Sequence, residues 1–288
     1  MIYIFLSVCC SVIVSILLKL ARRYSIDVFQ AITWNYSIAI ILTALFLKPQ
    51  FGNLAAAPVY SYAVLGVLLP ALFVVIAASV RFTGIVRTDT AQRLSLLVPL
   101  LSAFLIFGEQ FTPYKIIGIA IGLIAIVMLL IKPKDRYRDN RISKATWIYP
   151  LIVFLGFGLV DVMFKQLAQV KEVSYTTSLF IVYVLSFVLS FLGLVYLVAT
   201  KKAKFLWLHI FFGWILGVAN FGNILFYLLA HRSMSRSPSL VFSAMNIGVI
   251  ALGTLIGTIV FKEKTSWLNR IGIVLAIIAV IIIAHATK

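Results

Sequence analysis

Two related stretches decide the fold of this chain: FGEQFTPYKIIGI at residues 107–119 and FKEKTSWLNRIGI at residues 261–273. In both, a phenylalanine lies two residues before a glutamate, Glu109 or Glu263, and the triplet Ile-Gly-Ile follows at the same distance. All five identities are displaced by the same 154 positions, from Glu109 to Glu263. Self-similarity at a fixed spacing indicates an internal repeat. The chain is therefore predicted to consist of two related halves.

The composition indicates a membrane protein. The chain is 63% hydrophobic and 11% charged, with a mean hydropathy of +1.11, whereas soluble domains are about 45–50% apolar and about 25% charged. Apolar runs of about 20 residues, the length of a helix that crosses a bilayer core, recur along the chain and do not alternate as barrel strands would. They predict an all-α integral membrane protein with ten transmembrane helices, at residues 2–20, 28–47, 59–80, 90–108, 114–131, 146–168, 175–199, 206–230, 238–261 and 267–286.

The two repeats each contain five predicted spans. We place the first repeat at residues 1–131, a basic connecting loop at 132–145 and the second repeat at 146–288. Because five is odd, the second copy enters the membrane from the opposite side, which makes an inverted repeat of the kind common in secondary transporters. Further equivalent positions are Lys19 and Lys165, Tyr36 and Tyr183, Gly66 and Gly217, Arg81 and Arg232, and Gln92 and Asn246.

With these features the chain resembles the EamA-like members of the drug/metabolite transporter superfamily. The resemblance covers essentially the whole chain and is carried by the ten spans, the two halves, FGE at 107–109, FKE at 261–263 and the glycines Gly118 and Gly272. It implies a two-by-five helix bundle that moves small organic solutes. It also implies a central cavity lined by spans one to four and six to nine, with spans five and ten packed outside.

Polar residues inside the spans are the candidates for solute contact. In span four, Gln92, Ser95, Pro99 and Ser102 share one helical stripe, and Ser243, Asn246, Gly253 and Gly257 repeat it in span nine, as expected for a face on a partly wet cavity. Pro99 frees the carbonyl of Ser95, which predicts either a break facing a cavity or a hydrogen-bonded helix junction. Gly118 and Gly122 are expected to pack helices closely, within the chain or in a dimer.

Span eight adds Asn220, Asn223 and Tyr227 on one face, whereas the aligned positions of span three are apolar. In span two, Asn35 needs a hydrogen-bond partner, because an unsatisfied amide in hydrocarbon costs several kcal/mol. Either the solute or another helix supplies that partner.

Three ionisable residues lie within predicted spans. Asp161 and Lys165 in span six are one turn apart, so Asp161 either couples transport to protons or pairs with Lys165. Arg93 in span four either binds an anionic group of the solute or pairs with Asp89.

Other functions find little support in the sequence. His209, His231 and His285 lie near span ends without metal-ligand spacing, and no phosphate loop or nucleophile elbow is present, so we predict no enzyme, no metal and no cofactor. Cys9 and Cys10 lie inside the first span, where no disulfide framework is expected. The formal net charge of +17 fits anionic lipid head groups and orientation rather than nucleic acid. Either a monomer or a homodimer is compatible with the sequence.

Loop charges and family resemblance disagree on orientation. Lysines and arginines concentrate in the loops after odd-numbered spans, above all at residues 132–144, which the positive-inside rule places in the cytoplasm with both termini outside. The resemblance implies both termini inside.

The sequence therefore predicts a multi-pass inner-membrane carrier that moves, and in particular exports, a small metabolite, amino acid or amphipathic compound by alternating access. A channel of the same fold and a structural or receptor-like membrane protein are the alternatives. We expect Glu109 and Glu263 to cap the turns near the starts of the helices that follow them, at opposite aqueous surfaces, rather than to take part in transport.

Overall fold

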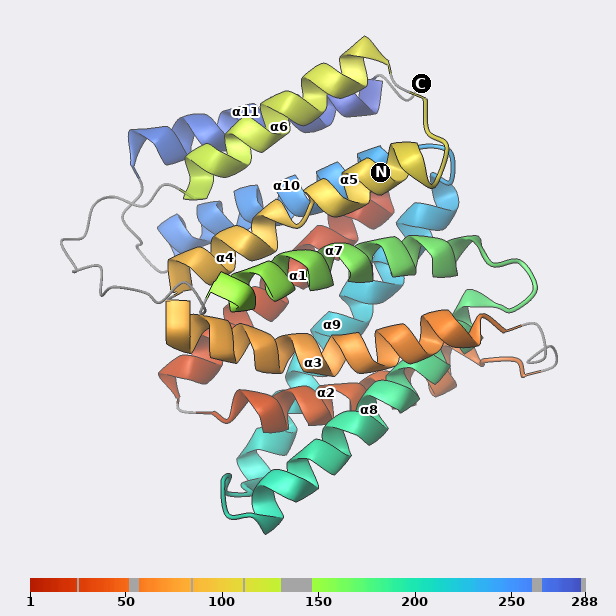
Figure 1. The fold of residues 1–288 in the computed structure, drawn as a ribbon, viewed down its shortest axis with the longest axis vertical. Helices are drawn as coiled ribbons and strands as arrows, with labels where there is room; N and C mark the ends of the chain where they lie inside the picture. The colour runs from red at the N-terminus through yellow and green to blue at the C-terminus, as the bar shows by residue number, and fades with distance from the viewer. Residues whose placement is uncertain are drawn as a thin grey trace. The chain divides into compact units, whose positions relative to one another are not determined.

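The computed structural model describes residues 1–24, 26–51, 57–83, 85–110, 112–130, 147–260 and 266–285, and these residues are helices and connecting segments without strands (Figure 1). Some predictions concern parts of the chain outside the described residues: Glu263, the connecting loop and the side chains of Lys19, Arg81 and Asp89. The helices are α1 (Ile2–Arg23), α2 (Val28–Leu42), the π-helix η1 (Thr43–Leu47), α3 (Val59–Thr83), α4 (Ile85–Leu94), α5 (Leu97–Leu105), α6 (Pro113–Leu130), α7 (Ile148–Gln169), α8 (Tyr175–Ala199), α9 (Trp207–Ser233), α10 (Pro238–Ile259) and α11 (Trp267–His285).

Six of the described helices are long and apolar enough to cross a membrane, and all six coincide with predicted spans. They are Val28–Leu47, Val59–Val80, Ile148–Gln169, Tyr175–Ala199, Trp207–Ser233 and Pro238–Ile259. The other four predicted spans coincide with shorter apolar helices, at Ile2–Leu18, Ala91–Leu105, Pro113–Met128 and Trp267–Ile283. The all-helical class is therefore confirmed.

Span four is not one continuous helix, because it breaks at Ser95 and Leu96 between α4 and α5. Pro99 has no N–H for the carbonyl of Ser95, which instead accepts the N–H of Val98 at 3.0 Å in a tighter turn. The hydroxyl of Ser95 donates to the carbonyl of Gln92 at 2.6 Å. The break thus satisfies the carbonyl that the proline frees.

The described chain forms two compact units that do not follow the two halves of the sequence. Unit 1 draws on residues 1–9, 75–162 and 233–288, and includes α4, α5, α6, α10 and α11. Unit 2 draws on residues 10–74 and 163–232, and includes α2, η1, α8, α9 and most of α3. Each unit therefore contains helices from both predicted repeats.

Within each unit, the packed helices include pairs at equivalent places in the two predicted repeats. In unit 1, α6 lies along α11, and α10 packs on α5 (Figure 1). In unit 2, α2 packs on α8. These pairs correspond to spans five and ten, four and nine, and two and seven. The arrangement is compatible with a two-fold relation between the repeats.

Glycines allow close packing inside unit 1. A Cβ atom at Gly118 would lie 2.5 Å from Ile283 Cγ1 of α11, and one at Gly122 would lie 2.5 Å from Ile247 Cδ1 of α10. Both glycines of this small-residue pair therefore face helices of the same chain.

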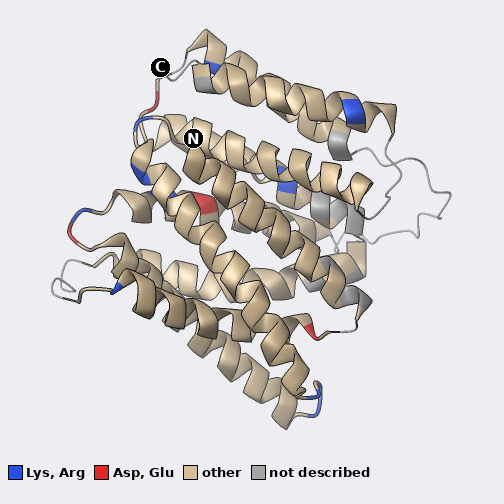
Figure 2. Cartoon of the chain, turned by 180° about the vertical axis from the view of Figure 1, so that it is seen from behind, with Lys and Arg blue, Asp and Glu red and all other residues tan. Residues whose placement is uncertain are grey.

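Charged side chains are sparse on the described helices. Figure 2 shows Lys, Arg, Asp and Glu mainly at helix ends and in connecting segments, while most of the helical ribbon belongs to other residue types. Many large apolar side chains are exposed, among them Phe46, Leu105, Trp207 and Trp267. Such a surface is suited to contact with lipid acyl chains.

Candidate functional site

The packing of α9 against α2 in unit 2 depends on two glycines one turn apart. A Cβ atom at Gly213 would lie 2.5 Å from the carbonyl oxygen of Ala31, and one at Gly217 would lie 2.6 Å from that of Asn35. Only glycine allows this approach, as small residues do at close helix crossings in membranes. The contact brings the polar face of α9 against α2.

One turn beyond Gly217, two carboxamides meet between the helices. The Nδ2 atom of Asn220 donates to Oδ1 of Asn35 at 3.1 Å. Asn35 is 1% exposed and Asn220 is half-buried. The interhelical partner that Asn35 requires is therefore present, and it is another residue predicted to contact solute.

At the same level of unit 2, α8 contributes two buried hydroxyl groups. Tyr183 and Ser186 are both 0% exposed, and neither Tyr183 Oη nor Ser186 Oγ has a hydrogen-bond partner among the described residues. The Tyr183 ring is 6.5 Å from that of Phe221 of α9, and Tyr36 of α2 is also buried. Tyr36 and Tyr183 are equivalent residues of the two repeats.

Together these residues form a polar layer near the middle of α2, α8 and α9. We define the midplane polar layer as Asn35, Tyr36, Tyr183, Ser186 and Asn220. An unsatisfied buried hydroxyl group costs about 1–3 kcal/mol, so a transmembrane core keeps such groups at a cost in stability. Intramembrane polar groups of this kind typically indicate a functional site.

An aromatic cluster adjoins this layer. The Trp34 ring lies 6.2 Å from each of the rings of Phe187 and Phe191 of α8, and its Nε1 atom is buried without a partner among the described residues. The cluster provides an apolar surface with one unused N–H donor beside the neutral hydrogen-bonding groups of the layer.

The remaining predicted contacts of unit 1 lie on three helices. Gln92 and Arg93 are half-buried near the end of α4, Asp161 is half-buried on α7, and Asn246 is half-buried on α10. Asn246 donates through Nδ2 to the carbonyl of Phe242 in its own helix at 3.1 Å. Three of the polar stripe residues, Ser95, Ser102 and Ser243, are buried.

The remaining predicted contacts of unit 2 lie on α7 and α9. Lys165 of α7 is 0% exposed, Asn223 is half-buried and Tyr227 is buried. The Tyr227 ring makes edge contacts with Phe164 at 6.3 Å and with His231 at 4.6 Å. Among the residues that the structure describes, no group of His, Cys, Asp and Glu is arranged to hold a metal ion.

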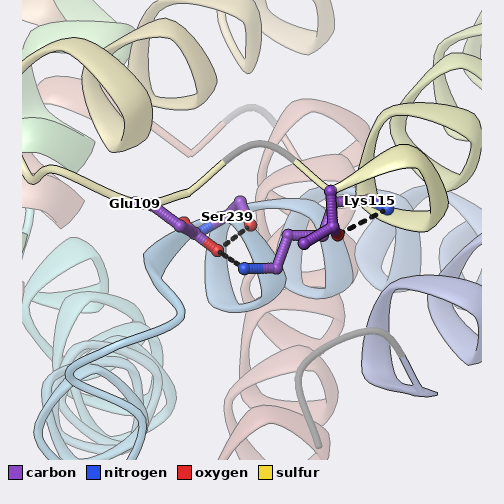
Figure 3. A network of polar contacts seen from close by, with 4 residues as sticks. Glu109, Lys115 and Ser239 are labelled. Atoms are coloured by element: carbon purple, nitrogen blue, oxygen red, sulfur yellow. Dashed lines mark hydrogen bonds and ion pairs between the residues drawn. The ribbon is translucent and has the colours of Figure 1, made fainter.

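Sequence reasoning missed the hydroxyl groups of Tyr183 and Ser186 as site residues, and it set aside His231, which is completely buried. The equivalence of Tyr36 and Tyr183 in the repeats was the available signal. A second correction concerns Glu109, which does not cap the helix that follows it. Thr112 lies at the start of α6, and Glu109 contacts α10 instead (Figure 3).

Comparisons with known proteins agree with this architecture. Residues 1–131 match the EamA-like transporter family. A Haemophilus influenzae protein, named only as an uncharacterized protein, is 39% identical over 289 residues, which are 98% of this chain and 97% of its own. A solved crystal structure with 15% identity has the same fold, with a TM-score of 0.72 over 99% of this chain and 96% of its own. The chain belongs to the EamA-like transporter family and is a multi-pass membrane protein.

Proposed function

We propose that this protein is a secondary transporter of the cell's inner membrane, which exports a small organic solute by alternating access between two inverted five-helix repeats. The midplane polar layer carries this proposal. The predicted contacts Gln92, Arg93, Asn223, Tyr227 and Asn246 stay part of it.

The physical support is the unused hydrogen-bonding capacity in unit 2. Tyr183 Oη and Ser186 Oγ are buried without partners among the described residues. A solute with hydroxyl, amide or amino groups would supply these partners when it binds. The cost of burying the two hydroxyl groups in the empty state would then be offset by the solute, as expected of a binding site whose residues are selected for function rather than stability.

The test uses purified protein in liposomes, screened against amino acids, sugars, nucleotide metabolites and amphipathic amines, with and without a pH gradient. Saturable uptake and counterflow of one solute class are expected. Uptake without saturation or counterflow would favour a channel of the same fold, and no flux of any solute would favour a structural or receptor-like protein.

Removal of single hydroxyl groups links this transport to the layer. Tyr183→Phe is expected to raise the solute concentration for half-maximal counterflow about tenfold. The stability of the empty protein should be equal or higher, because the Tyr183 hydroxyl has no hydrogen-bond partner among the described residues to lose. Tyr62→Phe is the matched control, since Tyr62 Oη is hydrogen-bonded to Ser178 Oγ at 2.8 Å in the same unit. It is expected to lower stability by about 1 kcal/mol without changing solute affinity. The reverse pattern would remove Tyr183 from the site.

Coupling to protons is proposed at Asp161, with Lys165 one turn further along α7. An ionisable group at the centre of a span costs at least about 2.5 kcal/mol on insertion scales, and such a costly residue typically has a function in the membrane. Asp161→Asn is expected to abolish uptake driven by a pH gradient and to spare counterflow. Driven uptake at the level of the unchanged protein would exclude Asp161 from coupling.

A further inference from the structure

The segment between α5 and α6 places a carboxylate inside unit 1. Gly108, with φ of +65°, reverses the chain after α5 in a conformation that glycine adopts easily. The N–H of Glu109 then donates to the carbonyl of Ala103 at 3.0 Å. As a result the Glu109 side chain points inward and is only 1% exposed, instead of facing water.

The described partners of this carboxylate converge on one point (Figure 3). Ser239 donates through its hydroxyl to Oε1 at 2.6 Å and through its backbone N–H to Oε2 at 2.8 Å. The ammonium group of Lys115, in the first turn of α6, lies 3.0 Å from Oε1. Two hydrogen bonds and one ion pair therefore hold a buried acid between the starts of two helices.

The helix start that Glu109 reaches lacks a cap of its own. Ser239 is the second residue of α10, and the residue before the helix, Ser237, makes no side-chain cap hydrogen bond. The first N–H groups of a helix have no partner within the helix, and a negative charge there is favoured by the helix dipole. The Glu109 carboxylate supplies both the acceptor and the charge from 130 residues away.

We propose that Glu109 is a positioning residue: its carboxylate is a tethered ligand of an anion site formed by the first turn of α10 and Lys115, and it fixes α10 of the second repeat to the α5–α6 turn of the first. The helix fixed in this way carries Ser243 and Asn246, and only that link to solute contact depends on the proposed transport function. The site accepts a carboxylate as such, so a small free carboxylate can replace the side chain.

The equivalent positions in the first turns of α6 and α11 carry different polar residues. Asn269 of α11 is the repeat equivalent of Lys115, and it accepts from the N–H and hydroxyl of Ser266 at 2.9 and 2.8 Å while donating to the carbonyl of Met128 at 3.0 Å. There the uncharged amide connects the start of α11 to the end of α6. Lys115, in contrast, places a positive charge at a helix start, where only a nearby carboxylate makes it favourable.

The experiment measures hydrogen exchange of α10 amides by mass spectrometry on purified full-length protein, so it requires no solute. In Glu109→Ala, exchange in the first turn of α10 is expected to accelerate about five- to tenfold, as loss of a helix cap predicts. Sodium formate should slow it again, whereas sodium chloride at equal ionic strength should not. Glu172→Gln, which changes an exposed carboxylate, is the control and should leave α10 unchanged.

A charge exchange separates a cap from a simple ion pair. The double variant Glu109→Lys with Lys115→Glu keeps the pair but puts an ammonium group at the α10 N–H groups, so α10 exchange should stay as fast as in Glu109→Ala. Recovery in this double variant, no acceleration in Glu109→Ala, or no response to formate would each overturn the proposal. If Glu109→Ala does not fold, Glu109→Gln, which keeps an acceptor and loses the charge, should show a smaller acceleration, and unchanged exchange would overturn it equally. Because none of these readouts involves transport, their failure is distinct from failure of the proposed function.

Discussion

Gly217→Ala tests whether the contact between α9 and α2 positions the midplane polar layer. The added Cβ would overlap Ile38 Cγ2 and would lie 2.6 Å from the carbonyl oxygen of Asn35, which is backbone and cannot turn away. Overpacking typically costs about 1–3 kcal/mol. The displacement also removes the Asn35–Asn220 hydrogen bond, worth about 0.5–1.5 kcal/mol, while alanine regains about 1 kcal/mol of helix propensity. The expected net loss is about 2 kcal/mol.

Gly253→Ala is the matched control, because it adds the same methyl group at a position where, among the described residues, no atom outside the local helix backbone lies within 4 Å. This variant should be equal to the unchanged protein or more stable by up to about 1 kcal/mol. The assay is thermal aggregation of purified protein followed by size-exclusion chromatography, with solute counterflow as a second measurement. Equal stability of Gly217→Ala and Gly253→Ala would refute the close packing of α9 on α2 at Gly217.

Two further predictions concern local hydrogen bonds. Asn35→Ala and Asn220→Ala should be coupled in a double-mutant cycle by about 0.5–1.5 kcal/mol of stability, and additive effects would show that their hydrogen bond contributes nothing. Pro99→Ala restores an N–H for the Ser95 carbonyl, so hydrogen exchange of residues 96–99 should slow as α4 and α5 join; unchanged exchange would mean that the break does not depend on the proline.

Hydropathy and length predicted the helices well, because apolar runs of about 20 residues have few alternatives in a membrane. For span four, the sequence left open whether the helix would break toward a cavity or form a hydrogen-bonded junction. Pro99 shows that the Ser95 carbonyl loses its usual donor, but it does not show which N–H replaces that donor. Tyr183 and Ser186 were missed because an apolar run does not show which hydroxyl groups lack partners. Partners are set by packing between α2, α8 and α9, which are distant in sequence.

Glu109 is another residue whose partner could not be predicted from the sequence. Because Glu109 lies only a few residues before α6 in the sequence, it was predicted to cap that helix. In the structure Thr112 accepts the N–H of Lys115 at 3.4 Å, which serves that helix start. The Glu109 carboxylate instead contacts α10. The position of α10 next to Glu109 depends on the tertiary packing of unit 1. Local rules therefore predicted the kind of role, a helix cap, and not the helix.

The distance in sequence between Glu109 and Ser239 also sets an order of events during synthesis. The two residues are 130 positions apart, and at about 5–20 residues per second the ribosome needs about 6–26 s to reach Ser239 after Glu109. For most of that interval the first half is already made, and its acid lacks the backbone and hydroxyl donors of α10. The Glu109 contacts with α10 can therefore form only after the second half has been synthesised. In a chain released from the ribosome before Ser239, Lys115 would be the one remaining partner of this carboxylate among those described.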